Sequence, residues 1–130
     1  MIKNYLSRGG RAVFFIDGVL VNNDLSTGET TNNLFSLIEN YGIKINKNLV
    51  LSTSAELVNF GNEQIQFLTT YPFWLKTNSF NSKTSYFANV IQLTFPWVSS
   101  LTLNKEKDAE VTELVKTSNK SWEQDRKSVV

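Results

Sequence analysis

A short apolar run near the start of the chain constrains its fold more than any other feature. Residues 11–17 have the sequence RAVFFID, in which five apolar side chains follow one another between Arg11 and Asp17. A strand of a parallel sheet is covered on both faces, so its sequence is apolar without alternation. The run therefore predicts a central strand of a parallel sheet, buried on both sides.

The segments around this run predict a strand, a helix and a second strand. Residues 1–7 have the spacing of a short helix, which Gly9 would end in a left-handed conformation. Residues 33–41 have an apolar stripe at helical spacing, and Gly42 follows them as a helix stop. Residues 43–51 return to an extended pattern. This order is typical of α/β proteins.

Polar residues follow the predicted first strand. Asp17, Asn22 and Asn23 are candidates for ligand binding, because ligands of open α/β sheets collect beyond the carboxyl ends of the strands. The alternative is that Asp17 accepts backbone N–H groups and so orders the loop that it begins. Acidic pairs elsewhere in the chain lie among lysines, as in solvated turns, and none predicts a catalytic carboxylate pair.

The middle of the chain is rich in aromatic residues. Residues 60–100 predict an irregular, partly antiparallel insert, in which Trp74 and Trp97 are candidate binding residues. Exposed aromatic rings stack on sugars or anchor protein interfaces, whereas buried ones would form a local core of the insert. Residues 111–118 favour a strand over a helix, and residues 119–130 predict a frayed polar tail.

Length and composition exclude several classes of protein. A chain of 130 residues is about one domain. It has no cysteine and no histidine, which excludes a thiolate nucleophile, a zinc–thiolate site and a Ser-His-Asp relay. Its formal net charge of +1 gives no general attraction to nucleic acid. We therefore expect no enzymatic activity, no cofactor, no metal site and no nucleic-acid partner.

Three segments, in their order and spacing, resemble the auxiliary component of ABC-type transport systems that is associated with gliding motility in some bacteria. They begin with YLSRGGRAVFFID, NNLFSLIENYG and LVKTSNKSW, and they cover Tyr5–Asp17, Asn33–Val50 and Leu114–Trp122. Most of the matching residues are fold-forming, so the order of the segments supports the resemblance more than any one motif. Gly18 departs from the family, whose members often have proline after the aspartate.

The resemblance implies a three-layer α/β sandwich with a mostly parallel central sheet. Such a fold is similar to flavodoxin-like and class I glutamine-amidotransferase-like domains, without their catalytic residues. We expect one domain over residues 1–130, excised from a longer membrane-anchored protein whose membrane segments lie outside this chain. The resemblance also implies an extracytoplasmic location, at the periplasmic or cell-surface face of a bacterial membrane. We expect a non-catalytic domain of the accessory subunit that acts by binding a partner subunit, an envelope component or a transported molecule. The implied partners are the permease and ATPase subunits or other envelope proteins.

Two other functions stay open at this point. The aromatic and acidic residues also fit a carbohydrate-binding or degenerate glycan-processing domain. The second alternative is a structural dimerisation domain, which would make the protein a homo-oligomer.

The transporter interpretation predicts a particular gene neighbourhood. We expect genes for an ATPase and for a permease with several membrane spans beside the gene for this protein, because the resemblance implies that the three products work together. Genome sequence around the gene is the measurement. A neighbourhood without either gene would contradict the interpretation.

Overall fold

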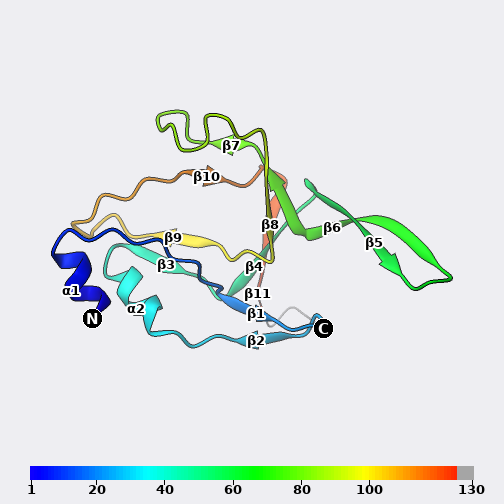
Figure 1. The fold of residues 1–130 in the computed structure, drawn as a ribbon, viewed down its shortest axis with the longest axis horizontal. Helices are drawn as coiled ribbons and strands as arrows, with labels where there is room; N and C mark the ends of the chain where they lie inside the picture. The colour runs from blue at the N-terminus through cyan, green and yellow to red at the C-terminus, as the bar shows by residue number, and fades with distance from the viewer. Residues whose placement is uncertain (126–130) are drawn as a thin grey trace.

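The structure is a computed structural model that describes residues 1–125, and it consists mainly of short antiparallel strands (Figure 1). Two short helices and eleven strands occur among these residues. In chain order they are α1 (Ile2–Ser7), β1 (Val19–Val21), β2 (Thr27–Glu29), α2 (Asn33–Glu39), β3 (Ile43–Ile45), β4 (Asn48–Ser52), β5 (Ala55–Gly61), β6 (Gln66–Thr77), β7 (Ser79–Phe80), β8 (Leu93–Pro96), β9 (Leu101–Leu103), β10 (Val115–Lys116) and β11 (Ser121–Asp125).

The predicted three-layer α/β sandwich with a mostly parallel sheet is wrong. Every strand pair among residues 1–125 is antiparallel. The pairs form four two-stranded sheets and one three-stranded sheet of β5, β6 and β8. Adjacent parallel strands need a crossover connection, usually a helix, whereas α1 precedes every strand and α2 connects β2 to β3, which do not pair with each other. The flavodoxin-like and amidotransferase-like comparison fails for the same reason.

The predicted central strand at residues 11–17 is not a strand. It leads from α1 to β1 without pairing to any other part of the described chain. β1 pairs with β2 alone, and β3 pairs antiparallel with β9 instead of parallel with the first strand. The apolar composition of the run is that of a buried strand, but none of the described strands pairs with it.

Both predicted helices are confirmed. Gly9 follows α1 with a φ of 83°, and Gly42 follows α2 with a φ of 86°, the left-handed conformation that glycine adopts without strain. The side chain of Asn32 caps α2, because its Oδ1 accepts a hydrogen bond from the backbone N–H of Leu34 at 2.8 Å.

The core is centred on β4. All five residues of β4 are buried. β11 pairs with β4 along its full length, from Ser121 opposite Ser52 to Asp125 opposite Asn48. Residues 121–125 are therefore a strand and not the predicted frayed tail, while residues 126–130 of that predicted tail lie outside the described residues.

The three-stranded sheet occupies the middle of the chain, where an irregular insert was predicted. β6 has twelve residues and lies between β5 and β8. Glu56 links all three strands, because its carboxylate lies 3.7 Å from the Lys76 ammonium and accepts a hydrogen bond of 2.8 Å from the Thr94 hydroxyl. The sheet packs against the core through Leu75, whose side chain has no exposed surface.

Leu75 provides a test of this core. We expect Leu75→Ala to lower the free energy of unfolding by about 2–5 kcal/mol, because it leaves a cavity in a fully buried site. The matched control is Leu68→Ala in the same strand, where the leucine is 64% exposed and the expected change is within about 0.5 kcal/mol. Urea denaturation of both variants measures the difference, and equal stabilities would contradict this packing.

Candidate functional site

The predicted polar residues do not form one cluster. Asp17 lies before β1, and Asn22 and Asn23 follow it, so they stand at opposite ends of the strand. All three are exposed. The backbone carbonyl of Asp17 accepts a hydrogen bond from the Thr30 hydroxyl at 3.1 Å, which fixes the start of the β1–β2 hairpin. β1 pairs with the antiparallel β2 and has no parallel neighbour. These side chains therefore do not lie together at the carboxyl ends of parallel strands.

Asn22 belongs to the turn between β1 and β2. Asp24 Oδ1 accepts hydrogen bonds from the Ser26 hydroxyl at 2.6 Å and from the Ser26 N–H at 3.0 Å. The Asn22 side-chain amide donates to the same hydroxyl at 2.9 Å. The bonds from Ser26 stabilise the charged carboxylate and hold the pKa of Asp24 below its ordinary value. The polar groups of this turn therefore order the turn itself.

The two predicted tryptophans do lie together. The rings of Trp74 and Trp97 meet edge to face, with their centroids 5.4 Å apart and an interplanar angle of 89°. Trp97 has a φ of 48°, an unusual conformation for a bulky residue, and its N–H donates to the Phe73 carbonyl at 2.8 Å. This bond holds Trp97, which directly follows β8, against β6.

These tryptophans are one end of a continuous row of rings, which we call the aromatic ladder. Tyr71 contacts both indoles, and its hydroxyl accepts a bond of 3.4 Å from the Trp97 indole N–H. Phe60 lies 5.4 Å from Tyr71 between ring centroids and stacks on Phe67, its cross-strand partner. Phe73 completes the ladder beside Tyr71.

The ladder is a poor platform for sugars. Trp74 and Trp97 are both half-buried, and each has its ring packed against other aromatic rings. Sugar stacking needs a flat aromatic face that is open to solvent. The arrangement therefore disfavours the carbohydrate-binding alternative and is that of a structural support.

The ladder supports a long hairpin, which we call the arm. It consists of β5, the first half of β6 and the turn at residues 62–65. Asn62 closes the turn, because its side chain accepts hydrogen bonds from the N–H groups of Gln64 and Ile65. Gly61, with a φ of 140°, lies so close to the Ile65 carbonyl that no side chain fits there. Figure 1 shows the arm projecting away from the other strands.

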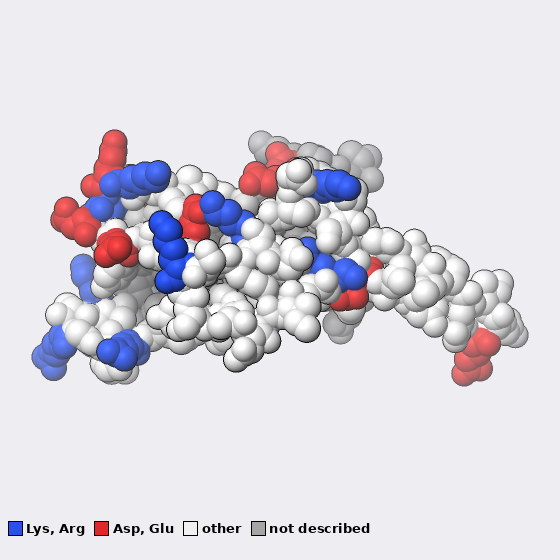
Figure 2. Space-filling model, turned by 90° about the horizontal axis from the view of Figure 1, so that it is seen from above, with Lys and Arg blue, Asp and Glu red and all other residues white. Residues whose placement is uncertain are grey.

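The surface of the arm is almost without charge and mixes large apolar side chains with uncharged polar ones. Between residues 57 and 70 the only ionisable side chain is Glu63 in the turn. Figure 2 shows the same contrast, because basic and acidic side chains are spread over the body while the arm at the right is white except near its tip. Four large apolar side chains are exposed on it, namely Leu57, Ile65, Phe67 and Leu68. An exposed apolar surface of this kind is typical of a protein-binding site.

None of these four residues was among the binding residues predicted from the sequence. The available signal was the run from Leu57 to Tyr71, in which strand-forming residues surround the turn sequence GNEQ and only one residue is charged. The aromatic density of the sequence indicated Trp74 and Trp97, whereas the exposed side chains are three aliphatic residues and Phe67.

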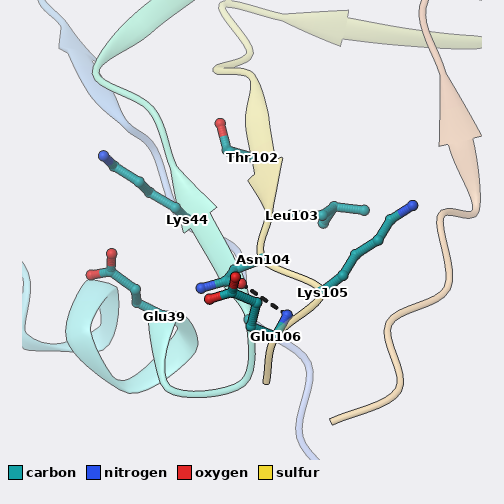
Figure 3. A pocket seen from close by; sticks show the side chains of 8 residues that line it. Glu39, Lys44, Thr102, Leu103, Asn104, Lys105 and Glu106 are labelled. Atoms are coloured by element: carbon teal, nitrogen blue, oxygen red, sulfur yellow. Dashed lines mark hydrogen bonds between the residues drawn. The ribbon is translucent and has the colours of Figure 1, made fainter. Parts of the chain in front are cut away.

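A second feature is an open pocket of about 580 Å³ beside α2 and β9 (Figure 3). Its charged residues are two glutamates, Glu39 and Glu106, and two lysines, Lys44 and Lys105. Figure 3 shows Lys105 pointing away from Glu39 and Lys44, so the charges do not converge. The remaining lining residues are Gly42, Thr102, Leu103 and Asn104. This mixture of acidic, basic and uncharged side chains does not favour any one class of ligand.

No cluster of three or more acidic side chains within residues 1–125 could hold a metal ion. Neither helix in that range is long and apolar enough to cross a membrane. Of the features described above, the arm is therefore the one whose chemistry points to a partner.

Comparison with known proteins gives a family and one curated relative. The family model described as an ABC-type uncharacterized transport system matches residues 1–130. A protein of Borreliella burgdorferi, named only as an uncharacterized protein, is 37% identical over 94 residues. The match covers 69% of this chain and 18% of that protein. The chain thus spans less than a fifth of the length of this relative. No solved structure matches the chain significantly.

The turn at Asp24 leads to a prediction about pH. The Asp24 carboxyl should titrate below 3.8, so its contribution to the turn is complete above that pH and is lost as the pH falls through the lower, folded pKa. Ser26→Ala removes the hydroxyl bond, which is the largest cause of the shift, and should raise the titration midpoint toward 3.8. NMR titration of the Asp24 carboxyl measures both midpoints. Identical midpoints would contradict the assigned bond.

Proposed function

Because the chain belongs to the ABC-type uncharacterized transport system family, whose members are auxiliary components of ABC-type transporters, we propose that it is a non-catalytic binding domain. Its task in the accessory subunit is to bind another protein of the transport system. We propose that the arm is the surface that makes this contact. The family description does not mention gliding motility, and that association stays a prediction.

The observation that supports binding is the amount of surface that the chain leaves exposed. The accessible surface is 10156 Å², whereas a compact monomer of 14.8 kDa exposes about 7,000 Å². Soluble monomers seldom expose large contiguous apolar patches, and those that do use them for interaction. The arm carries exposed apolar side chains on both faces of one projecting element, Leu57 and Leu68 on one face and Phe67 on the other.

The arm also offers hydrogen-bonding groups to a partner. β8 pairs with β6 only from Trp74 to Thr77, so among residues 1–125 the stretch of β6 from Gln66 to Tyr71 has β5 on one side and no strand on the other. An open strand edge binds an additional strand through main-chain hydrogen bonds, while the side chains beside it give specificity. The aromatic ladder keeps the arm rigid, which reduces the entropy lost on binding.

We propose the permease subunit as the partner of the arm. In this proposal the domain lies on the extracytoplasmic side of the membrane and belongs to a longer, membrane-anchored subunit. The greater length of the Borreliella burgdorferi relative is consistent with that arrangement. The lack of cysteine and histidine supports a binding role, since it removes the side chains that most nucleophilic and general-base sites use.

Replacing an arm leucine should weaken the contact with the permease. We expect Leu57→Thr to reduce the affinity at least about tenfold, because it removes an apolar contact and keeps a strand-forming residue. The measurement is binding of the purified full-length subunit to the neighbouring permease in detergent. The matched control is Leu101→Thr, since Leu57 is 60% exposed and Leu101 is 59% exposed and both lie in strands.

A photo-crosslinking amino acid at position 57 or 101 gives an independent readout. We expect crosslinks to the permease from position 57 and not from position 101. Equal affinities of the two threonine variants, or equal crosslinking from both positions, would contradict the assignment of the contact to the arm.

A further inference from the structure

The run at residues 11–17 has a backbone that pairs with no described strand. The backbone N–H and C=O groups of residues 12–16 make no hydrogen bond within the described chain. Figure 1 shows the run as the dark blue trace between α1 and β1. None of its residues has a positive φ, so the backbone is compatible with a strand.

From Val13 to Ile16 the side chains alternate between exposed and half-buried, as they do in a strand with one outer face, while Arg11 and Ala12 before them are both exposed. Val13 is 81% exposed and Phe15 is 97% exposed, whereas Phe14 and Ile16 are half-buried. A period of two residues is the period of an extended chain. Two large apolar side chains therefore point outward beside unbonded backbone groups. This combination makes an edge that accepts a further strand.

The charges of the run are arranged symmetrically about Phe14. Arg11 and Asp17 lie three residues before and after it, both are exposed, and neither side chain makes an ion pair or hydrogen bond within residues 1–125. We propose that two copies of this chain pair through residues 11–17 as antiparallel strands, with a two-fold axis at Phe14.

This register matches unlike partners at every outer position. Arg11 of one copy lies opposite Asp17 of the other, and Val13 lies opposite Phe15, each pair occurring twice by symmetry. Opposite charges and pairs of an aromatic with a β-branched residue are the favourable cross-strand combinations. A parallel pairing would place arginine opposite arginine and aspartate opposite aspartate. The charge pattern therefore selects an antiparallel second copy, and an isologous contact of this kind closes as a dimer.

The pairing goes beyond the proposed contact with the permease and does not use the arm. It would also give the unpaired run the strand neighbour that its apolar sequence predicts. The competing occupant is a strand from elsewhere in a longer parent protein, which the test below separates from a second copy.

Charge reversal tests the register. We expect sedimentation of the chain to show a reversible dimer, and Arg11→Asp or Asp17→Arg alone to raise the dimer dissociation constant at least about tenfold through like-charge pairs. The double variant R11D/D17R should dimerise as the wild type does. A mixture of the two single variants should form a heterodimer, since one variant then carries two negative charges at these positions and the other carries two positive charges. Circular dichroism confirms that the variants are folded.

Cysteine crosslinking gives a second measurement, because the chain contains no cysteine of its own. A mixture of Val13→Cys and Phe15→Cys chains should form a disulfide-linked dimer faster than either variant alone. A monomer at every concentration would overturn the proposal and leave the edge to another segment. A dimer that the single charge reversals do not weaken would also overturn it.

Discussion

The burial of β4 is the constraint on which the rest of the structure depends. Its backbone has a partner on each side, because β11 pairs along one edge and the N–H of Val50 donates to the Val98 carbonyl at 2.8 Å on the other. Five buried residues in succession make this the one described strand without an exposed face. Residues 69 to 77 positions apart in the chain are thus paired through a single short strand, and β6 packs on it through Leu75.

The polar end of β4 shows how this core tolerates buried amides. Asn48 is nearly inaccessible, and its Oδ1 accepts the N–H of Ser100 at 3.0 Å while its Nδ2 donates to the Ser100 hydroxyl. A buried polar group is costly unless it is bonded in this way. The same corner explains Gly18. A side chain there would collide with the Asn46 carbonyl and the Ser99 hydroxyl, so only glycine lets the chain enter β1.

Local features of the fold could be predicted from the sequence, and long-range ones could not. The capping amide of Asn32 and the two helix-ending glycines depend on neighbouring residues, so both helices were predicted correctly. Strand partners depend on residues far apart in the chain, and an apolar run such as residues 11–17 does not reveal whether a neighbour exists. At the candidate site, the aromatic density of the sequence identified Trp74 and Trp97. The hairpin register is needed to tell the side chains that support the arm from those that face solvent.

The small core also explains why binding surfaces are large in this chain. Because few residues are buried, parts of several strands lie outside the core and keep apolar surface exposed. A partner that buries this surface gains the free energy of removing it from water. The arm and the run at residues 11–17 differ in chemistry, because the arm is almost uncharged while the run ends in Arg11 and Asp17. An uncharged edge accepts varied apolar partners, whereas paired charges select one register. The two surfaces therefore suit different contacts, the arm another subunit and the charged run a second copy of this chain.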